Sequence, residues 1–366
     1  MPPIGAVRAQ AFTIPTDAPE ADGTASWDST TIIVVHAKAG DWEGIGYSYA
    51  DSSVAMLVTS KLASVVAGLD AMAPPRAWRA MQVAVRNLGR EGLAACAISA
   101  VDSALWDLKA KLLELPLADL LGRYRDEVPI YGSGGFTSYD DAQLAEQLSG
   151  WVEQDGCRWV KMKVGTHADR DPTRVAVAKA AIGDATLFVD ANGAYGVKQA
   201  IDLAARFAGE QGVTWFEEPV SSDDLAGLRR VRNHAPPAME VAAGEYGYEP
   251  TYFRRMLEAG AVDVLQADAT RCGGITGFML AAAQAEAFHV DLSAHCAPAL
   301  HRHLGLVAPR FRHCEWFHDH VRIERMLFDG APVPRGGVIA PDPGRPGLGL
   351  VFKQQDAAQF AVNTGG

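Results

Sequence analysis

The sequence predicts an α/β fold, a (β/α)8-type TIM barrel accompanied by an α+β domain. The first observation is a series of charged residues, each at the end of a short apolar run: Lys163, Asp190, Glu217, Glu245, Asp268, His295 and Glu315. Their successive separations are 27, 27, 28, 23, 27 and 20 residues, the length of one strand, one helix and two loops. The second observation is a β-then-α alternation from residue 128 onward. Charged groups at the same end of successive parallel strands form the active site of such a barrel.

Size and composition limit the class of protein. A chain of 366 residues with 48% hydrophobic content can bury a full core and predicts two domains. No apolar run approaches a membrane span of about 18 residues, and the N-terminus lacks the pattern of a signal peptide. The five cysteines show no CxxC spacing, so reduced thiols and a cytoplasmic location are expected. The charge of −11 argues against nucleic acid and anionic membranes as partners, but not against a small anionic substrate.

Residues 1–125 predict the α+β domain. Residues 1–14 are expected to form a strand, residues 15–24 a polar loop, and residues 27–38 and 43–49 a hairpin about Ala39, Gly40 and Asp41. Helices are expected from residue 51 to about 69, from about 76, and over 92–115, where Pro116 ends the last one. Strands followed by helices are typical of an α+β domain.

Residues 126–325 predict the barrel. Eight strands are expected at 128–132, 158–163, 186–190, 213–217, 239–243, 262–266, 290–294 and 312–316, with helices between them, for example over 140–153, 174–182, 198–208 and 277–288. No convincing helix follows the last strand. The tail, residues 326–366, is rich in Pro and Gly up to residue 349 and is expected to return to the N-terminal domain.

Three carboxylates end consecutive predicted strands. Asp190, Glu217 and Glu245 would face one mouth of the barrel, where they repel one another unless a cation lies among them. All-oxygen ligands suit Mg2+, or alternatively Mn2+, better than zinc. Glu218 competes with Glu217, because adjacent residues of a strand point to opposite faces.

Two lysines and a histidine–aspartate pair supply candidate acids and bases. Lys161 and Lys163 share a strand face, and their proximity is expected to depress the pKa of at least one, which would make it a general base. Asp268 and His295 end adjacent predicted strands, so the carboxylate could orient the imidazole. Cys296 is expected to point to the opposite face, and the other histidines are interpreted as ordinary helix or loop residues.

This constellation suits removal of a proton α to a carboxylate, provided that a cation and a hydrogen-bond donor stabilise the enediolate. Glu315, if held protonated by acidic surroundings, could be that donor. No GxSxG motif supports acyl transfer. A metal-dependent hydrolase would need a His-x-His pair on the first strand, where Tyr131, Gly132 and Ser133 stand instead. A non-catalytic barrel would be expected to have lost some of these residues.

The motifs resemble the enolase superfamily, and within it the mandelate racemase subgroup (the mandelate racemase/muconate lactonizing enzyme family), over essentially the whole chain. The matching segments are 161–163 (KMK), 189–192 (VDAN), 216–219 (FEEP), 244–245 (GE), Asp268, 273–277 (GGITG), 293–295 (SAH) and Glu315. The resemblance implies Mg2+ on Asp190, Glu217 and Glu245. It implies Lys163 and His295 as bases on opposite faces, Asp268 as the orienter of His295, and contacts from Lys161 and Glu315 to the substrate carboxylate. It also implies that the α+β region is a capping domain and that the chain forms a homo-oligomer, from dimer to octamer.

The resemblance leaves two reactions open, dehydration of a sugar acid and racemisation or epimerisation of a 2-hydroxy acid. The polar residues of segment 16–27 and the two tyrosines of 47–49 suit a polyol chain better than a phenyl ring, which favours an aldonate or aldarate dehydratase. Asn192, Trp27, Tyr47 and Arg271 are the candidate substrate-binding residues, the last standing where the racemase pattern has lysine. The expected partner is thus a small-molecule carboxylate.

Overall fold

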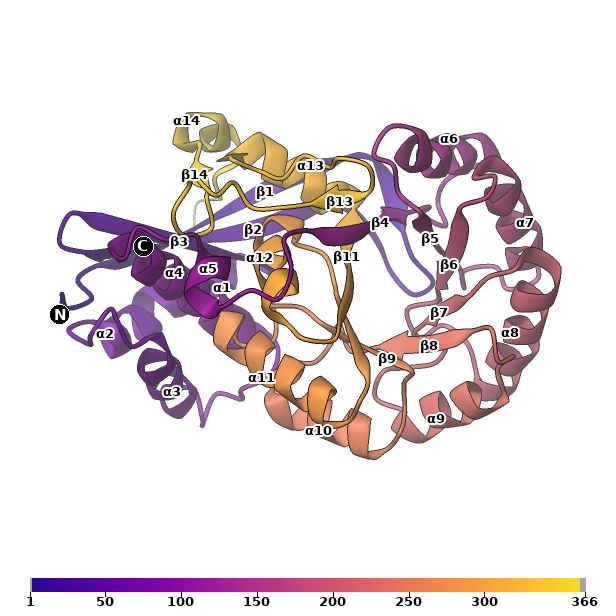
Figure 1. The fold of residues 1–366 in the computed structure, drawn as a ribbon, viewed down its shortest axis with the longest axis horizontal. Helices are drawn as coiled ribbons and strands as arrows, with labels where there is room; N and C mark the ends of the chain where they lie inside the picture. Colours follow the sequence, from indigo (N-terminus) through magenta and orange to yellow (C-terminus); the bar gives the residue numbers. More distant parts are fainter. Residues whose placement is uncertain (1, 363–366) are drawn as a thin grey trace.

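The computed structural model describes residues 2–362 and contains the predicted barrel (Figure 1). Neighbouring strands pair in parallel in chain order, and the last strand pairs with the first, Cys314 opposite Ile130, which closes the barrel. The strands are β4 (Val128–Gly134), β5 (Trp159–Lys163), β6 (Thr186–Asp190), β7 (Trp215–Glu217), β8 (Glu240–Ala243), β9 (Val264–Ala267), β10 (Asp291–Ala294) and β11 (Phe311–Phe317). The predicted TIM barrel is therefore confirmed.

Eight helices follow these strands, one after each, and form the outer ring (Figure 1). They are α6 (Asp141–Glu153), α7 (Asp171–Ala181), α8 (Val197–Gln211), α9 (Leu225–His234), α10 (Pro250–Glu258), α11 (Gly274–Ala287), α12 (Pro298–Val307) and α13 (His318–Leu327). The expectation that no helix follows the last strand was wrong. Helix α13 begins at the residue after β11, with no intervening turn, and its apolar face of Val321, Ile323 and Leu327 is buried.

The N-terminal domain is an antiparallel sheet covered by helices. Its strands are β1 (Val7–Ala21), β2 (Ser26–Ala39) and β3 (Trp42–Tyr49), in that order across the sheet. The helical segments are α1 (Ser53–Leu57), a π-helical turn (Val58–Leu62), α2 (Ala63–Val66), α3 (Pro74–Ala84), α4 (Leu93–Leu112) and α5 (Leu117–Leu121). Helix α4 packs against β3 so closely that a Cβ on Gly46 would lie 2.3 Å from the carbonyl oxygen of Ala100.

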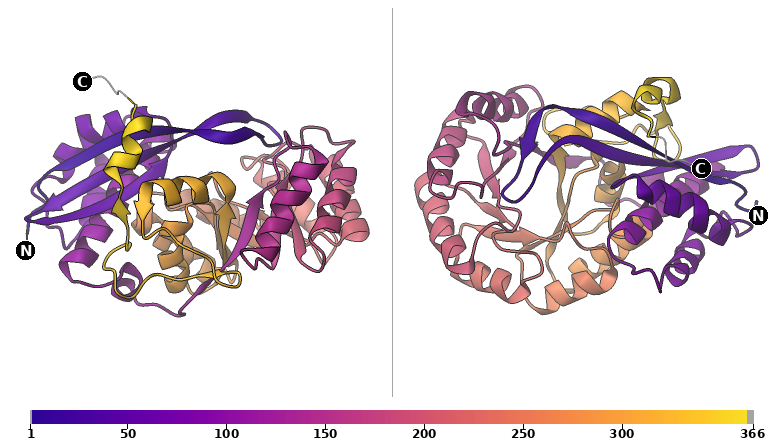
Figure 2. Two further views of the ribbon diagram at one scale, coloured as in Figure 1. Left: turned by 90° about the horizontal axis from the view of Figure 1, so that it is seen from above. Right: turned by 180° about the vertical axis from the view of Figure 1, so that it is seen from behind.

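The polar segment 15–24 is not a loop, as the sequence had suggested. It continues β1 to Ala21 and pairs with β2, Pro15 opposite Ser29 and Glu20 opposite Trp27, with an irregularity between these pairs. The turn lies at Asp22, whose Oδ1 accepts hydrogen bonds from the backbone N–H groups of Thr24 (2.6 Å) and Ala25 (2.7 Å). Polarity was misleading because much of this strand is solvent-accessible on both faces. We call the paired segments 15–21 and 26–29 the arm; it extends from the sheet across the mouth of the barrel (Figure 2).

The C-terminal tail contacts both domains. Its strands β12 (Phe328–Asp329) and β14 (Val351–Phe352) pair with each other, and β13 (Val338–Ile339) pairs with barrel strand β4. Phe352 packs on Phe12 of β1 with ring centroids 5.3 Å apart. Helix α14 (Gln354–Ala357) and a 3-10 turn (Ala358–Phe360) follow. Within residues 2–362, no helix is long and apolar enough to cross a membrane.

The interior of the barrel explains why the charged residues gather at one end. Tyr131, Phe188, Trp215 and Val264 form a separate apolar cluster inside the barrel. Because side chains alternate along a strand, the next inward positions after Phe188 and Trp215 are Asp190 and Glu217. The apolar cluster fills the barrel below them, so the carboxylates lie at the carboxyl ends of the strands.

Candidate active site

The structure brings together the three carboxylates that the sequence had proposed as metal ligands. One oxygen from each of Asp190, Glu217 and Glu245 lies within 4.8 Å of the others, and all three residues are buried. Asp190 is the register partner of Glu217 on the neighbouring strand. The Asp190–Glu217 pair therefore follows from strand register, because neighbouring parallel strands place the last inward residue of each side by side. Glu245 joins them from the segment that follows β8.

Strand alternation also separates Glu217 from Glu218. Phe216 points outward into the main core, so Glu217 points inward with Trp215. Glu218 follows the end of β7 with a positive φ of 37°, a conformation that turns the chain out of the strand pattern. Its side chain borders a neighbouring hollow with Asn192, Ser221 and Tyr252. Glu217 is thus the residue in the carboxylate cluster.

The two lysines lie against these carboxylates. Lys163 Nζ is 2.5 Å from Asp190 Oδ2, and Lys161 Nζ donates to Glu217 and lies 2.8 Å from Glu315 Oε1. Burial favours neutral lysine, but the surrounding carboxylates outweigh it and raise the pKa of both Lys161 and Lys163. The expectation of a depressed lysine pKa is therefore wrong for this arrangement, because carboxylate charge dominates over the mutual repulsion of the lysines.

His295 and Asp268 form the expected pair. Asp268 Oδ2 lies 2.8 Å from His295 Nδ1 and also 3.8 Å from Arg271 Nε. Burial raises the pKa of Asp268, but the hydrogen bond and charge of His295 outweigh it, and the net pKa is well below its usual value. Since Nδ1 faces a carboxylate, we assign the proton to Nδ1, which leaves Nε2 facing Glu245 Oε2 at 3.2 Å.

Glu315 does not have the acidic surroundings that the sequence had suggested. It accepts hydrogen bonds from Ser133 Oγ (2.6 Å) and the Cys296 backbone N–H (2.8 Å), in addition to its contact with Lys161. Burial raises the pKa of Glu315, but the charges of Lys161 and His295 outweigh it and hold that pKa well below its usual value. Glu315 is an ionised acceptor here, so the prediction of a protonated donor is wrong for this arrangement.

The charge of the cluster fits a divalent cation. Three buried carboxylates, Asp190, Glu217 and Glu315, contact the two buried lysines, and a fourth, Glu245, lies beside Asp190 and Glu217. Burial and, after it, the charge of Asp190 raise the pKa of Glu217 well above its usual value, and a cation beside these oxygens would favour the ionised form. Glu245 Oε2 has no hydrogen-bond partner among the described residues. Three convergent carboxylates with spare lone pairs are a donor set for Mg2+ or Mn2+.

A cavity of about 440 Å³ opens over this cluster, between the barrel and the arm. Lys163, Glu245 and His295 line its floor, and the candidate substrate-binding residues Asn192, Trp27 and Arg271 line its walls. Asn192 Oδ1 is buried without a partner in the described chain, and Arg271 lies 5.3 Å over the ring of Tyr246 and 3.2 Å from the carbonyl oxygen of Glu245. The volume is that of a site for a small molecule.

Two family models match the chain. The mandelate racemase/muconate lactonizing enzyme N-terminal domain matches residues 8–122, and the enolase C-terminal domain-like model matches residues 143–357. The chain belongs to the mandelate racemase subgroup of the enolase superfamily. In the terms of this family, the N-terminal sheet and helices are the capping domain and the barrel carries the site.

Relatives of this enolase-superfamily chain include several named enzymes. It is 33% identical to a 3,6-anhydro-alpha-L-galactonate cycloisomerase of Streptomyces coelicolor, over 98% of this chain and 99% of that one. A solved mandelate racemase/muconate lactonizing enzyme-like protein from Rubrobacter xylanophilus is 51% identical, with a TM-score of 0.96 and coverage of 99% and 100%. A solved L-talarate dehydratase from Polaromonas, complexed with Mg and L-glucarate, is 30% identical, with a TM-score of 0.89 and coverage of 99% and 98%.

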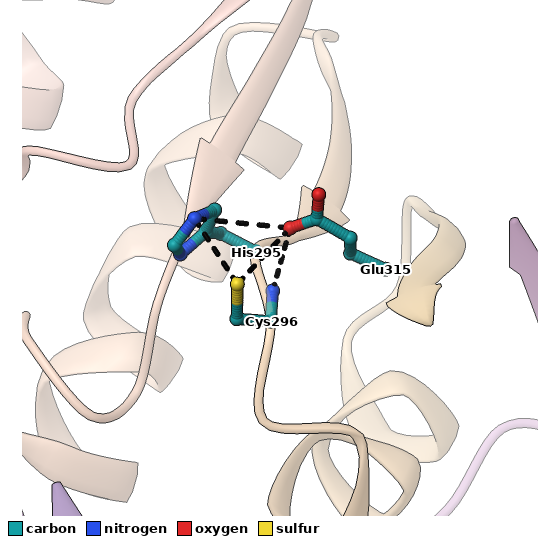
Figure 3. A group of neighbouring side chains, drawn as sticks. All are labelled: His295, Cys296 and Glu315. Atoms are coloured by element: carbon teal, nitrogen blue, oxygen red, sulfur yellow. Dashed lines mark hydrogen bonds and ion pairs between the residues drawn. The ribbon is translucent and has the colours of Figure 1, made fainter. Parts of the chain in front are cut away.

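Cys296 lies in the site of this enolase-superfamily protein, although its side chain was expected to point to the opposite face of the strand. Its Sγ lies 3.2 Å from His295 Nε2 and 3.4 Å from Glu315 Oε2, and it lines the cavity (Figure 3). Alternation along a strand does not apply here, because Cys296 and Ala297 both have a positive φ and reverse the chain after β10. No signal in the sequence indicates that turn.

His320 was also missed, and Tyr47 lies elsewhere than predicted. His320 stacks on Tyr49, with ring centroids 3.4 Å apart, and both line the cavity. Tyr47 is fully buried, and its hydroxyl donates to Glu324 Oε1 at 2.6 Å. Both tyrosines point from the same face of β3, but Tyr49 is two residues nearer the strand end and reaches the cavity. Tyr47 instead joins the capping domain to α13.

Proposed function

We propose that this chain removes the proton α to the carboxylate of a small acid with the help of Mg2+, and that its reaction is dehydration of an aldonate or aldarate to a 2-keto-3-deoxy acid. One observation carries the proposal. Lys163 and His295 reach the same carboxylate cluster from different sides, Lys163 at Asp190 (2.5 Å) and His295 at Glu245 (3.2 Å). A substrate carboxylate beside that cluster would have its α-carbon between two groups able to move a proton.

The residues have separate roles in this proposal. The Lys163 amine takes the α-proton, and the Lys161 ammonium binds the substrate carboxylate. When bound, the cation on Asp190, Glu217 and Glu245 supplies charge stabilisation for the enediolate and takes up carboxylate charge that otherwise keeps Lys163 protonated. His295, protonated at Nε2 and stabilised by Asp268, gives its proton to the departing β-hydroxyl. The hydroxyl leaves as water, and the enol product becomes the 2-keto acid.

The walls of the cavity support a polyol substrate. Besides Trp27 and Phe317, they carry short polar side chains of the turn after β1, of β2 and of the segment after β3, namely Asp22, Ser29, Thr30, Thr31 and Asp51. Tyr49 Oη and Asn192 Oδ1 have no partner among the described residues. Such groups can pair with substrate hydroxyls, whereas a purely hydrocarbon substrate would leave them unpaired at a cost. The Polaromonas relative, solved with Mg and L-glucarate, fits the same substrate class.

A second candidate is a cycloisomerase, because the Streptomyces coelicolor relative that matches nearly the whole chain carries that name. The proton steps would be the same, but the leaving oxygen would belong to a ring and stay attached to the product. Racemisation or epimerisation, in which His295 returns the proton to the opposite face, uses the same residues again.

The test is a screen of aldonic and aldaric acids, with their lactones and anhydro derivatives, in the presence of Mg2+. Formation of a 2-keto-3-deoxy acid that is lost in the Lys163→Ala variant is the expected result. Ring-opened isomer of unchanged composition would favour the cycloisomerase, and inverted configuration without keto acid would favour the racemase; either overturns the dehydratase assignment. As a matched control, Lys179→Ala changes a lysine at the far end of α7 and is expected to have no effect.

A further inference from the structure

We propose a second divalent-cation site, distinct from the carboxylate cluster, formed by Asp17, Glu20 and His318. One ligand atom of each lies within 4.8 Å of the others. Asp17 and Glu20 belong to the arm, and His318 is the first residue of α13. The three residues therefore meet where the capping domain lies against the barrel, and a cation there would join the two.

Unpartnered buried oxygens point to a ligand at this place. Glu20 is 0% exposed; its Oε2 accepts a hydrogen bond from Trp27 Nε1 (2.8 Å), but its Oε1 has no partner within residues 2–362. Asp319, next to His318, is also 0% exposed, and its Oδ2 likewise has none. Buried carboxylate oxygens are nearly always paired, so each of these two unpartnered oxygens requires an ion or a water.

The nearby Arg322 pairs with Asp319 but not with Asp17 or Glu20. Arg322 Nη2 bonds Asp319 Oδ1 (2.6 Å) and the carbonyl oxygen of Pro15 (2.7 Å), and in the described chain it makes no ion pair with Asp17 or Glu20. That leaves two carboxylates to His318, whose Nε2 lies 3.0 Å from Asp17 Oδ2. A cation binding there would therefore compete with no lysine or arginine of the described chain for Asp17 and Glu20.

The donor set indicates which cations fit. One imidazole nitrogen with two carboxylates suits Zn2+, Co2+ or Mn2+, whereas Mg2+ prefers oxygens alone. An N–O separation of 3.0 Å is close to the roughly 3.3 Å expected between ligands that each lie about 2.0–2.1 Å from a tetrahedral metal. The Asp17 and His318 side chains are 48% and 24% exposed, so an ion can enter from solvent.

Such a site would act on the cavity through Trp27. Glu20 is the register partner of Trp27 and bonds its indole, and Trp27 both lines the cavity and packs edge-on against Phe136, 5.7 Å away. Fixing Glu20 to α13 would therefore hold this wall of the cavity in place. Glu20 is a positioning residue in this account, not a catalytic one.

The experiment is a Co2+ and Zn2+ titration of the full-length protein, by calorimetry and by Co2+ absorption, with Mg2+ in large excess to occupy the carboxylate cluster. Wild-type protein is expected to bind one equivalent that Mg2+ does not displace. His318→Gln and Asp17→Asn should each weaken that binding at least tenfold while the metal-free melting temperature changes little, because both side chains are partly exposed. His234→Gln, at an exposed histidine ending α9, is the matched control and should bind normally.

Three results would overturn the proposal. The first is the absence of any equivalent that resists Mg2+. The second is unchanged binding in both His318→Gln and Asp17→Asn, which would place the ion elsewhere, for example at His295, Cys296 and Glu315. The third is that His318 and Asp17 form only an ion pair and bind no metal. Both variants would then melt at a lower temperature, and the wild-type protein would bind no Co2+ or Zn2+. None of these readouts depends on substrate turnover, so they stand apart from the proposed dehydratase reaction.

Discussion

The 2.8 Å contact between Asp268 Oδ2 and His295 Nδ1 decides which nitrogen of the imidazole faces the cavity. A buried carboxylate with a strongly lowered pKa holds the proton of the ring at Nδ1 and stabilises the imidazolium. Nε2 is then left toward Glu245 and the substrate cavity. The acid–base role of His295 therefore depends on a residue that does not itself line the cavity.

Replacing Asp268 with Asn should remove the charge and allow the wrong tautomer of His295. We expect turnover to fall by about 10²–10⁴-fold with little change in the binding of Mg2+, measured by steady-state kinetics and by calorimetry. Asp291→Asn changes a half-exposed carboxylate at the opposite end of β10, paired with surface arginines, and should leave turnover within about twofold. Equal losses in both variants would show that Asp268 has only a structural role.

The two adjacent glutamates provide a second test. Glu217→Gln removes one of three clustered ligands, so the Mg2+ dissociation constant should rise at least tenfold, in line with the effect of ligand or near-ligand changes in metal sites. Glu218→Gln should have a smaller effect, because Glu218 borders a different hollow. Calorimetric titration with Mg2+ distinguishes them. Normal binding by the Glu217→Gln variant together with loss of binding by the Glu218→Gln variant would reverse the ligand assignment.

Substitutions of Tyr47 and Tyr49 should have different effects, the first on the stability of the protein and the second on substrate binding. Tyr47→Phe leaves the buried Glu324 Oε1 without its donor, which should cost about 1–3 kcal/mol of stability but leave KM unchanged. Tyr49→Phe removes a hydroxyl that has no partner in the described chain and should raise KM while leaving stability nearly unchanged. Urea unfolding and steady-state kinetics on both variants give the comparison. If KM rose in the Tyr47→Phe variant and not in the Tyr49→Phe variant, Tyr47 rather than Tyr49 would be the residue that binds substrate.

The buried carboxyl group of Asp102 should make the stability of the protein depend on pH. Burial raises the pKa of Asp102 from 3.8 to about 7, although its carboxylate accepts bonds from Thr276 N and Oγ1, both at 2.8 Å. The folded state thus holds this proton more tightly than the unfolded state, so stability falls as pH rises from about 4 to 7. At about 1.4 kcal/mol per pKa unit, the difference in unfolding free energy between wild type and Asp102→Asn should shift by on the order of 2–4 kcal/mol across that window. Parallel curves for the two proteins would contradict the assignment.

The regular sequence separation of the charged strand ends was enough to predict the barrel. Repeats of nearly equal length bring equivalent residues to the same end of neighbouring parallel strands. Asp190 and Glu217, 27 residues apart, are register partners, and the same logic grouped Lys163 with Asp190. The strand pattern alone left Glu217 and Glu218 as alternatives. The structure decides between them, because Trp215 lies in the cluster inside the barrel and Glu217 shares its face.

Other features could not be read from local pattern. The left-handed turn at Cys296 and Ala297 and the stacking of His320 on Tyr49 depend on contacts between distant segments. The ionised state of Glu315 and the raised lysine pKa values depend on which charges come within a few ångströms, which spacing alone does not give. The first segment of the arm, residues 15–21, has the polar sequence of a loop because much of this strand is exposed to solvent. The domain boundaries, the homo-oligomer and the cytoplasmic location stay predictions.

Exchange of the α-proton is the most direct test of the central claim that Lys163 takes the α-proton and that His295 gives a proton to the departing β-hydroxyl. The measurement is proton NMR of an accepted sugar acid in D2O with Mg2+ and wild-type, Lys163→Ala or His295→Asn protein. We predict that His295→Asn still exchanges the α-proton without forming keto acid, and that Lys163→Ala does neither. Exchange that persists in Lys163→Ala, or that is absent from all three proteins while product still forms in wild type, would contradict the account.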